Sequence, residues 1–138
     1  MYSPALRHVL DHIRALVRAV AEQDTLDYDA RERGTRVEQE RAIGCAETEQ
    51  LIADLSQACL EQRNSETVRV ITLVQPDADP LHSDSTVGRE LAFVVSHTIH
   101  HQAMMADLAR RLGGQVPSDF GYAPGTVQHL NQCARSAS

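Results

Sequence analysis

A chain of 138 residues in which 42% are hydrophobic is long enough for one core, and we predict a single domain over residues 1–138. Its net charge is −6, and its 13 basic residues are all Arg and stand among acids, which argues against a nucleic-acid partner. No apolar run approaches the roughly 20 residues that span a bilayer, and three Cys residues without a CxxC pattern favour reduced thiols. We therefore expect a cytoplasmic protein with no membrane partner, and the scarcity of aromatic residues (4%) favours packed helices.

The first predicted element is a helix from Ser3 and Pro4 to about Glu22. Ser followed by Pro is typical of a helix start, and apolar residues then recur with a helical period. His8 and His12 lie one turn apart in this helix, beside its apolar stripe. Alone they would be polar residues on a solvated face, but a second histidine pair elsewhere would make them a source of a metal ligand.

The polar segment QDTLDYDARERGTR, residues 23–36, interrupts the helical period and predicts a loop. Its Tyr28, Arg31 and Arg33 allow two interpretations. They are solvated residues of a linker, or they belong to a lid whose side chains meet an anionic or polar ligand.

A second long helix is predicted from Val37 to about Arg63, with Gly44 favouring a kink or a later start. The β-branched residues of SETVRVITLV predict a short extended segment near 68–74. This segment either pairs with Leu81–Ser83 in a minimal hairpin or lies along the helices as an extended crossover.

A third long helix is predicted over Arg89–Leu112, capped by Ser85 or Thr86. Its apolar stripe contains Val94, His97, His101, Met104, Met105, Leu108 and Leu112, and Glu90 shares that face. His97 and His101 are one turn apart near the middle of the stripe. Buried imidazoles need partners for both nitrogens, and a divalent metal is the usual partner of such a pair. The alternative is a pair of core histidines that form hydrogen bonds to their neighbours.

A Pro- and Gly-rich loop, GQVPSDFGYAPGT, follows the third long helix. We expect Phe120 and Tyr122 to hold this loop against the helices. Thr126 is expected to cap a short last helix, Val127–Cys133.

Four stretches of this sequence resemble the DinB-like family of metal-binding four-helix bundles, which is related to the YfiT proteins. They occur in the family's order, and they are RHVLDH (Arg7–His12), DYDARERGTRVEQE (Asp27–Glu40), GRELAFVVSHTIHHQAMM (Gly88–Met105) and DFGYAPGT (Asp119–Thr126). The resemblance implies an all-α, up-and-down helix bundle of the DinB/YfiT type. We expect the usual first helix of that family to be missing here, since the sequence starts almost directly within the early histidine helix. A bundle short of one helix exposes apolar surface, so we expect a homodimer.

The resemblance also implies a metal held by three histidines. Two are the HxxxH pair, His97 and His101, and the third comes from the early helix, where it is either His8 or His12. Nickel, zinc, manganese and iron all suit three imidazoles. The remaining coordination positions of such a divalent ion would be open for chemistry.

Three functional hypotheses follow. The first is a metal-dependent enzyme, a transferase or hydrolase, which activates a low-molecular-weight thiol and transfers it to an electrophile. In that enzyme, Tyr28, Arg31 and Arg33 would orient a substrate carboxylate, and Glu90 would accept an imidazole N–H or a proton. The second is a non-catalytic, stress-associated metal-binding bundle that acts as a dimer. The third is a hydrogen-bonded histidine network without metal.

Overall fold

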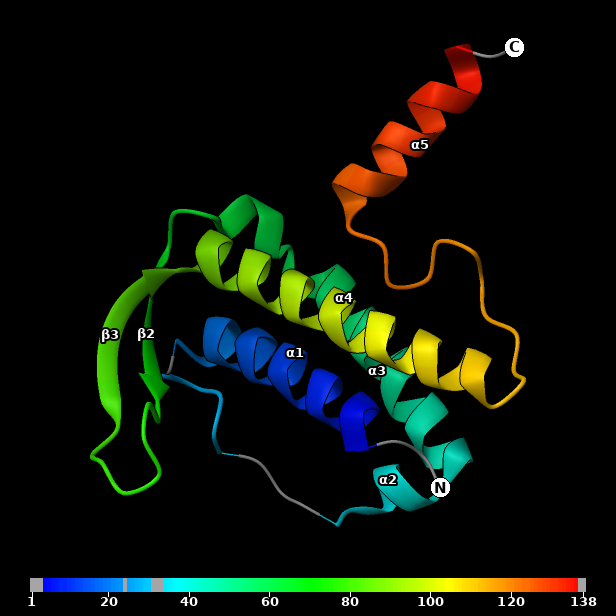
Figure 1. The fold of residues 1–138 in the computed structure, drawn as a ribbon. Helices are drawn as coiled ribbons and strands as arrows, with labels where there is room; N and C mark the ends of the chain where they lie inside the picture. The colour runs from blue at the N-terminus through cyan, green and yellow to red at the C-terminus, as the bar shows by residue number, and fades with distance from the viewer. Residues whose placement is uncertain (1–3, 24, 31–33, 137–138) are drawn as a thin grey trace. The chain divides into compact units, whose positions relative to one another are not determined.

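The structure is a computed structural model that describes residues 4–23, 25–30 and 34–136. Its elements are α1 (Pro4–Glu22), β1 (Leu26–Asp27), α2 (Arg36–Gln39), α3 (Arg41–Ala58), the 3-10 helix η1 (Leu60–Arg63), β2 (Thr67–Thr72), β3 (Leu81–Thr86), α4 (Val87–Arg111) and α5 (Pro124–Ser136) (Figure 1). The fold is mostly helical, as predicted. It is not all-α, because the three strands form one small sheet.

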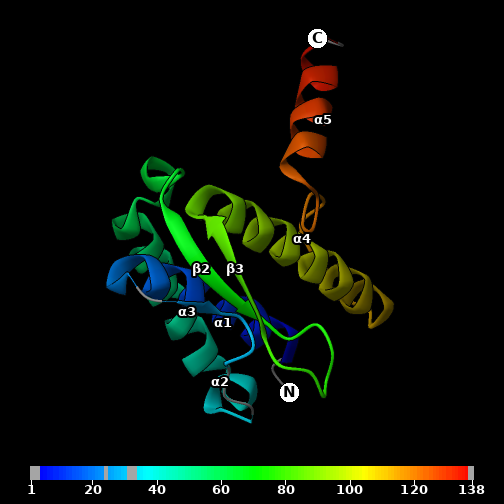
Figure 2. The same ribbon diagram turned by 90° about the vertical axis from the view of Figure 1, so that its left-hand side faces the viewer.

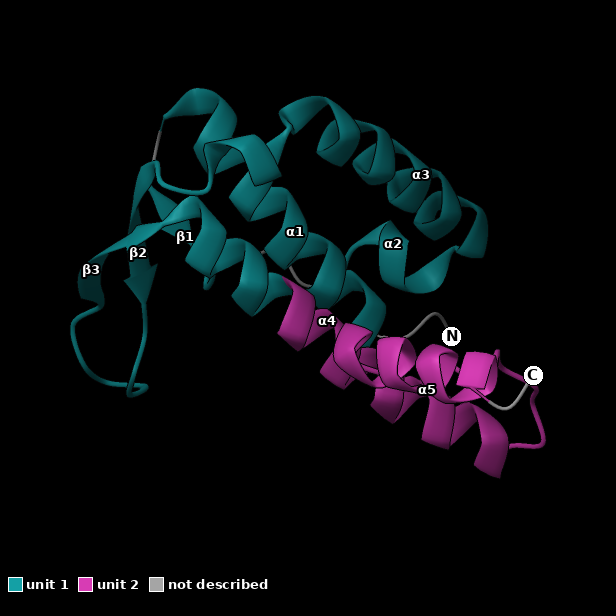
Figure 3. Cartoon of the chain, turned by 90° about the horizontal axis from the view of Figure 1, so that it is seen from above, with its two compact units in different colours: residues 1–94 teal, residues 95–138 magenta. Residues whose placement is uncertain are grey.

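The chain divides into two compact units, residues 1–94 and 95–138, and the boundary falls inside α4 (Figure 3). Unit 1 holds α1 to α3, the sheet and the first turns of α4. Unit 2 holds the rest of α4 and α5. The single domain over 1–138 stays a prediction. Among the described residues, no helix combines the length and the apolar character that crossing a membrane would require.

The first predicted helix is confirmed by α1, in which the apolar residues Val9, Leu10, Leu16 and Val20 are buried. The second predicted helix is wrong in its continuity, because the chain breaks at Glu40 and again at Cys59. Glu40 has extended φ and ψ of −115° and 108°, and Cys59 is left-handed with a φ of 47°. Gly44 is buried inside α3 and marks neither break.

The extended segment predicted near 68–74 is confirmed by β2, and its partner is a full antiparallel strand. The register of β2 and β3 runs from Thr67↔Thr86 to Thr72↔Leu81, which is longer than the minimal hairpin expected (Figure 2). The two residues of β1 pair in parallel with β2, Leu26 opposite Val70. This strand was not predicted, since two residues are too short to show an alternating pattern.

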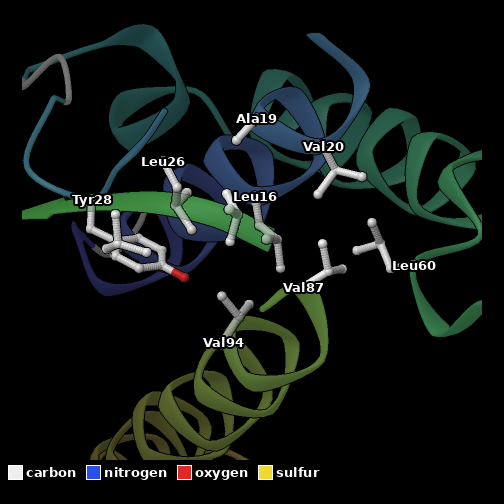
Figure 4. Close-up of a cluster of buried hydrophobic side chains, with 10 residues drawn as sticks. Leu16, Ala19, Val20, Leu26, Tyr28, Leu60, Val87 and Val94 are labelled. Carbon is white, nitrogen blue, oxygen red and sulfur yellow. The ribbon is translucent and has the colours of Figure 1, made fainter. Parts of the chain in front are cut away.

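The core of unit 1 is formed where α1, the sheet and the start of α4 meet (Figure 4). Its fully buried apolar side chains include Leu16 (1% exposed), Leu26 (0%) and Val87 (2%). The other buried members are Ala19, Val20, Tyr28, Leu60, Val68, Val70 and Val94. β1 therefore fixes the segment after α1 to this core through Leu26, which brings Tyr28 to the core's edge.

In unit 2, the end of α4 departs from the predicted buried stripe. Ala106 is buried, but Met104, Leu108 and Leu112 are 54%, 55% and 79% exposed. The helix ends at Arg111, and Gly113 in the turn after it has a φ of 78° and donates its N–H to the Arg110 carbonyl. α5 starts three residues earlier than the predicted Val127, because Pro124 begins its first turn.

Candidate functional site

The candidate site is a pocket of about 540 Å³ in unit 1. We call it the unit 1 pocket. Its walls come from α1, the segment after β1, the β2–β3 hairpin and the first turns of α4. Its lining residues include His8, His12, Tyr28, Asp29, Asp84, Ser85, Arg89, Glu90 and Phe93.

Glu90 is a fully buried carboxylate at this pocket, with 0% of its surface exposed. Its Oε2 accepts a hydrogen bond from the Tyr28 hydroxyl at 2.9 Å. Its Oε1 accepts from the Ser85 hydroxyl at 2.6 Å and from the Arg89 guanidinium at 2.7 Å. A buried charge is tolerated when charge-assisted hydrogen bonds replace its water. Among the described residues, these partners are hydroxyls and a guanidinium, rather than the imidazole considered for Glu90 from the sequence.

Tyr28 is buried, and its hydroxyl is held in the role of a donor. Burial raises the pKa of Tyr28 well above its ordinary value, and the negative charge of Glu90 raises that pKa further. The phenol therefore stays protonated at neutral pH and donates to the carboxylate. The ring lies at the edge of the core cluster (Figure 4).

A chain of ring contacts leads from Tyr28 to the histidines of α1. The Tyr28 and His12 ring centroids are 4.9 Å apart, and those of His12 and His8 are 4.3 Å apart. Phe93 packs against Tyr28 at 5.2 Å. His12 is buried within this group and His8 is half-buried at its end. The predicted early histidine pair therefore lines a pocket rather than a solvated face.

Within unit 1, α1 and the first turns of α4 run in opposite directions (Figure 1). Val87 lines a second pocket together with Ala19 and Val20, near the end of α1. Two turns later on α4, Phe93 lines the unit 1 pocket together with His8, near the start of α1.

In unit 2, His97 and His101 lie side by side on α4, as their spacing predicted. Their ring centroids are 4.6 Å apart with an interplanar angle of 75°, and both residues are half-buried. Burial, and then the neighbouring His100, lower the pKa of His101. A lower pKa favours the neutral imidazole, which is the form that binds metal ions.

Two of the residues selected from the sequence, Tyr28 and Glu90, are joined by a direct hydrogen bond. Arg31 and Arg33 lie outside the described residues. The sequence did not assign a site role to Ser85, Arg89 or Phe93. Helix spacing offered one signal, because Phe93 follows Glu90 by three residues and so lies on a neighbouring part of the same helix surface.

The sequence is similar to FK506-binding protein 5 of Rhizopus delemar, with 30% identity over 107 residues. These residues make up 78% of this chain and 28% of that protein, so the chain spans less than a third of the length of the curated relative it matches. No protein-family model matches the sequence, and no solved structure matches it.

Proposed function

We propose that this protein is an enzyme that depends on a divalent transition metal held by His8, His97 and His101. Its substrate would lie in the unit 1 pocket beside Tyr28 and Glu90. The observation that carries the proposal is the His97–His101 pair, whose rings lie 4.6 Å apart on one turn of α4. An i, i+4 histidine pair offers two ligands to one ion, and a third is needed from another helix.

Helix geometry supports His8 as that third ligand. His97 comes one turn after Phe93 on the uninterrupted helix α4, and His8 comes one turn before His12 on α1. Phe93 and His8 both line the unit 1 pocket. We prefer His8 to His12, because the His12 ring packs against Tyr28.

Three imidazoles suit zinc, nickel, manganese or iron, and the set contains no thiolate of the kind common in structural zinc sites. When bound, the ion would supply Lewis acidity to a thiol or water at its open positions. The protein's own contribution would be the fixed pair of Tyr28 and Glu90. The carboxylate holds the phenol in one orientation, so that its oxygen lies at the pocket as a hydrogen-bond acceptor for substrate.

The resemblance of four stretches to the DinB-like family also favours a metal site and, within that family, a low-molecular-weight thiol as co-substrate.

The test is elemental analysis of untagged protein purified without added metal. We expect about one equivalent of a transition metal in the wild type, and its loss in His97→Ala and His8→Ala. His129→Ala is the matched control, because it removes an exposed imidazole from α5. Loss in His12→Ala with retention in His8→Ala would instead make His12 the early ligand. If no variant carries metal and none binds on titration, the proposal fails.

Turnover is tested separately on the metal-loaded protein. Glutathione and an α,β-unsaturated carboxylate serve as the thiol and the electrophile, with His97→Ala as the blank. Metal-dependent consumption of both would support the thiol transferase. A bound metal without consumption would favour the non-catalytic dimer.

A further inference from the structure

We propose that the unit 1 pocket selects substrates that carry a carboxylate, and that Arg89 is the residue that binds it. This inference rests on the proposed function, because it names the substrate class of the same site. It departs from the sequence-based expectation, in which Arg31 and Arg33 were the cations of the pocket.

Arg89 is held in place at this pocket from two sides. One guanidinium nitrogen, Nη1, donates to Glu90 at 2.7 Å, and the guanidinium carbon lies 6.0 Å from the centre of the Phe93 ring. Glu90 is itself fixed by Tyr28 and Ser85. The side chain of Arg89 is nevertheless 68% exposed. A cation that is anchored along one edge and open along the other is ready to receive a ligand without losing much conformational freedom.

The free edge of the guanidinium determines which ligand fits. Among the described residues, Nε and Nη2 of Arg89 have no acceptor, and two parallel N–H groups match the two oxygens of a carboxylate. Lys would offer a point charge instead, and a neutral ligand would gain less from a charged donor.

The acidic residues around the pocket are already engaged, which weakens the case for an amine as ligand. Asp84 lies 3.5 Å from the Arg69 guanidinium. Oδ2 of Asp29 accepts the Leu73 N–H at 2.8 Å. Glu90 accepts three hydrogen bonds. A divalent ion bound at His8, which lines this pocket, would add positive charge and further favour an anion.

The rings of His12, Tyr28 and Phe93 give the pocket an aromatic wall beside Arg89. An aromatic carboxylate would therefore pack its ring there while its carboxylate meets the guanidinium. Benzoate is the simplest probe with this chemistry. Benzamide has nearly the same shape without the charge, and benzylammonium reverses the charge.

The experiment is a titration of each probe, followed by the NMR signals of the histidine rings. We expect benzoate to shift the His8 and His12 signals. Benzamide and benzylammonium should bind with at least about tenfold lower affinity than benzoate. Arg89→Gln should lower the affinity for benzoate at least about tenfold. Arg111→Gln is the control, because it removes another exposed Arg of α4 that is paired with an acid, Asp107 at 2.8 Å, and it should bind like the wild type.

A second variant guards against simple loss of structure. Arg89→Lys keeps the positive charge beside Glu90 but lacks the two parallel N–H donors of a guanidinium. Its affinity for benzoate should lie between those of the wild type and Arg89→Gln, and its melting temperature should equal that of the wild type. Equal benzoate affinity in Arg89→Gln and wild type would overturn the proposal. Tightest binding of benzylammonium would overturn it as well.

Metal content separates this proposal from the first. Arg89→Gln should retain the metal that His97→Ala loses, because Arg89 is not a ligand. Protein that binds no metal but still binds benzoate through Arg89 would refute the metal enzyme and leave the carboxylate pocket. Protein that binds metal, and whose benzoate affinity does not depend on Arg89, would refute the carboxylate pocket and leave the metal enzyme.

Discussion

At the scale of single residues, the hydrogen bond between Tyr28 and Glu90 makes a testable contribution to stability. Tyr28→Phe keeps the buried ring and removes one of three donors from a fully buried carboxylate. We expect the free energy of unfolding to fall by about 1.5–3 kcal/mol, the range for hydrogen bonds to charged groups. Urea denaturation of wild type and variant measures this difference.

The control for this change is Tyr122→Phe, since Tyr122 is 45% exposed. It removes the same hydroxyl oxygen from an exposed residue of unit 2. Substitutions at exposed positions usually change the free energy of unfolding by less than about 0.5 kcal/mol. Equal midpoints for Tyr28→Phe and Tyr122→Phe would show that Glu90 does not depend on the phenol.

At the scale of elements, Gly121 fixes the loop between α4 and α5. Its φ is 87°, and an added Cβ would lie 2.6 Å from the backbone N and Cα of Ala103. Gly121→Ala should therefore destabilise unit 2 by more than the roughly 1–2 kcal/mol of a left-handed conformation alone, because the contact with the α4 backbone must also open. Faster hydrogen exchange in residues 115–125 would report it.

Gly125 is the matched control for this prediction. It lies in the first turn of α5, and a Cβ there meets nothing within 4 Å. Gly125→Ala should leave stability unchanged or raise it slightly, because Ala is the better helix former. If Gly121→Ala behaves in the same way, the loop does not depend on its close approach to Ala103.

Elements with a strong local signal could be predicted from the sequence. The apolar period and the Ser-Pro start predicted both ends of α1 to within one residue, and the run of β-branched residues predicted β2. Thr86 caps α4 as one of the two expected residues, since its Oγ1 accepts the Arg89 N–H at 3.3 Å. The break at Glu40 has no such signal, and neither has the two-residue β1, whose partner Val70 is distant in the sequence.

The candidate site was predictable in part for the same reason. Helical spacing gave the two histidine pairs, since i and i+4 always share a face. The Glu90 partners Tyr28 and Ser85 depend on how β1 and the hairpin meet α4, which no local pattern records. Tyr28 lies 62 residues from Glu90 in the sequence, so their contact could not be read from spacing.

At the scale of the whole molecule, the exposed apolar residues at the end of α4 bear on the expected homodimer. Met104, Leu108 and Leu112 recur every fourth residue and are each more than half exposed. We predict that the wild type sediments with twice the mass of one chain. Leu108→Glu should shift it towards the monomer, because a charge in an apolar interface loses its water.

The control for the dimer is Arg110→Glu, which changes the charge of an exposed residue on the same helix outside that stripe. It should sediment like the wild type. Monomeric wild type at all concentrations would contradict the predicted homodimer.

The parallel pairing of β1 with β2 has a consequence for the order in which the molecule assembles. β2 and β3 are joined by the short segment Leu73–Pro80, whereas the Asp29–Leu73 contact beside β1 closes a separation of 44 residues. Closing a longer loop costs more conformational entropy before the contacts that stabilise it have formed. The hairpin should therefore form early, and the segment that carries Tyr28 should dock late. The pocket would then be the last part of unit 1 to become native, and mutations in it should mainly speed unfolding and leave the folding rate nearly unchanged.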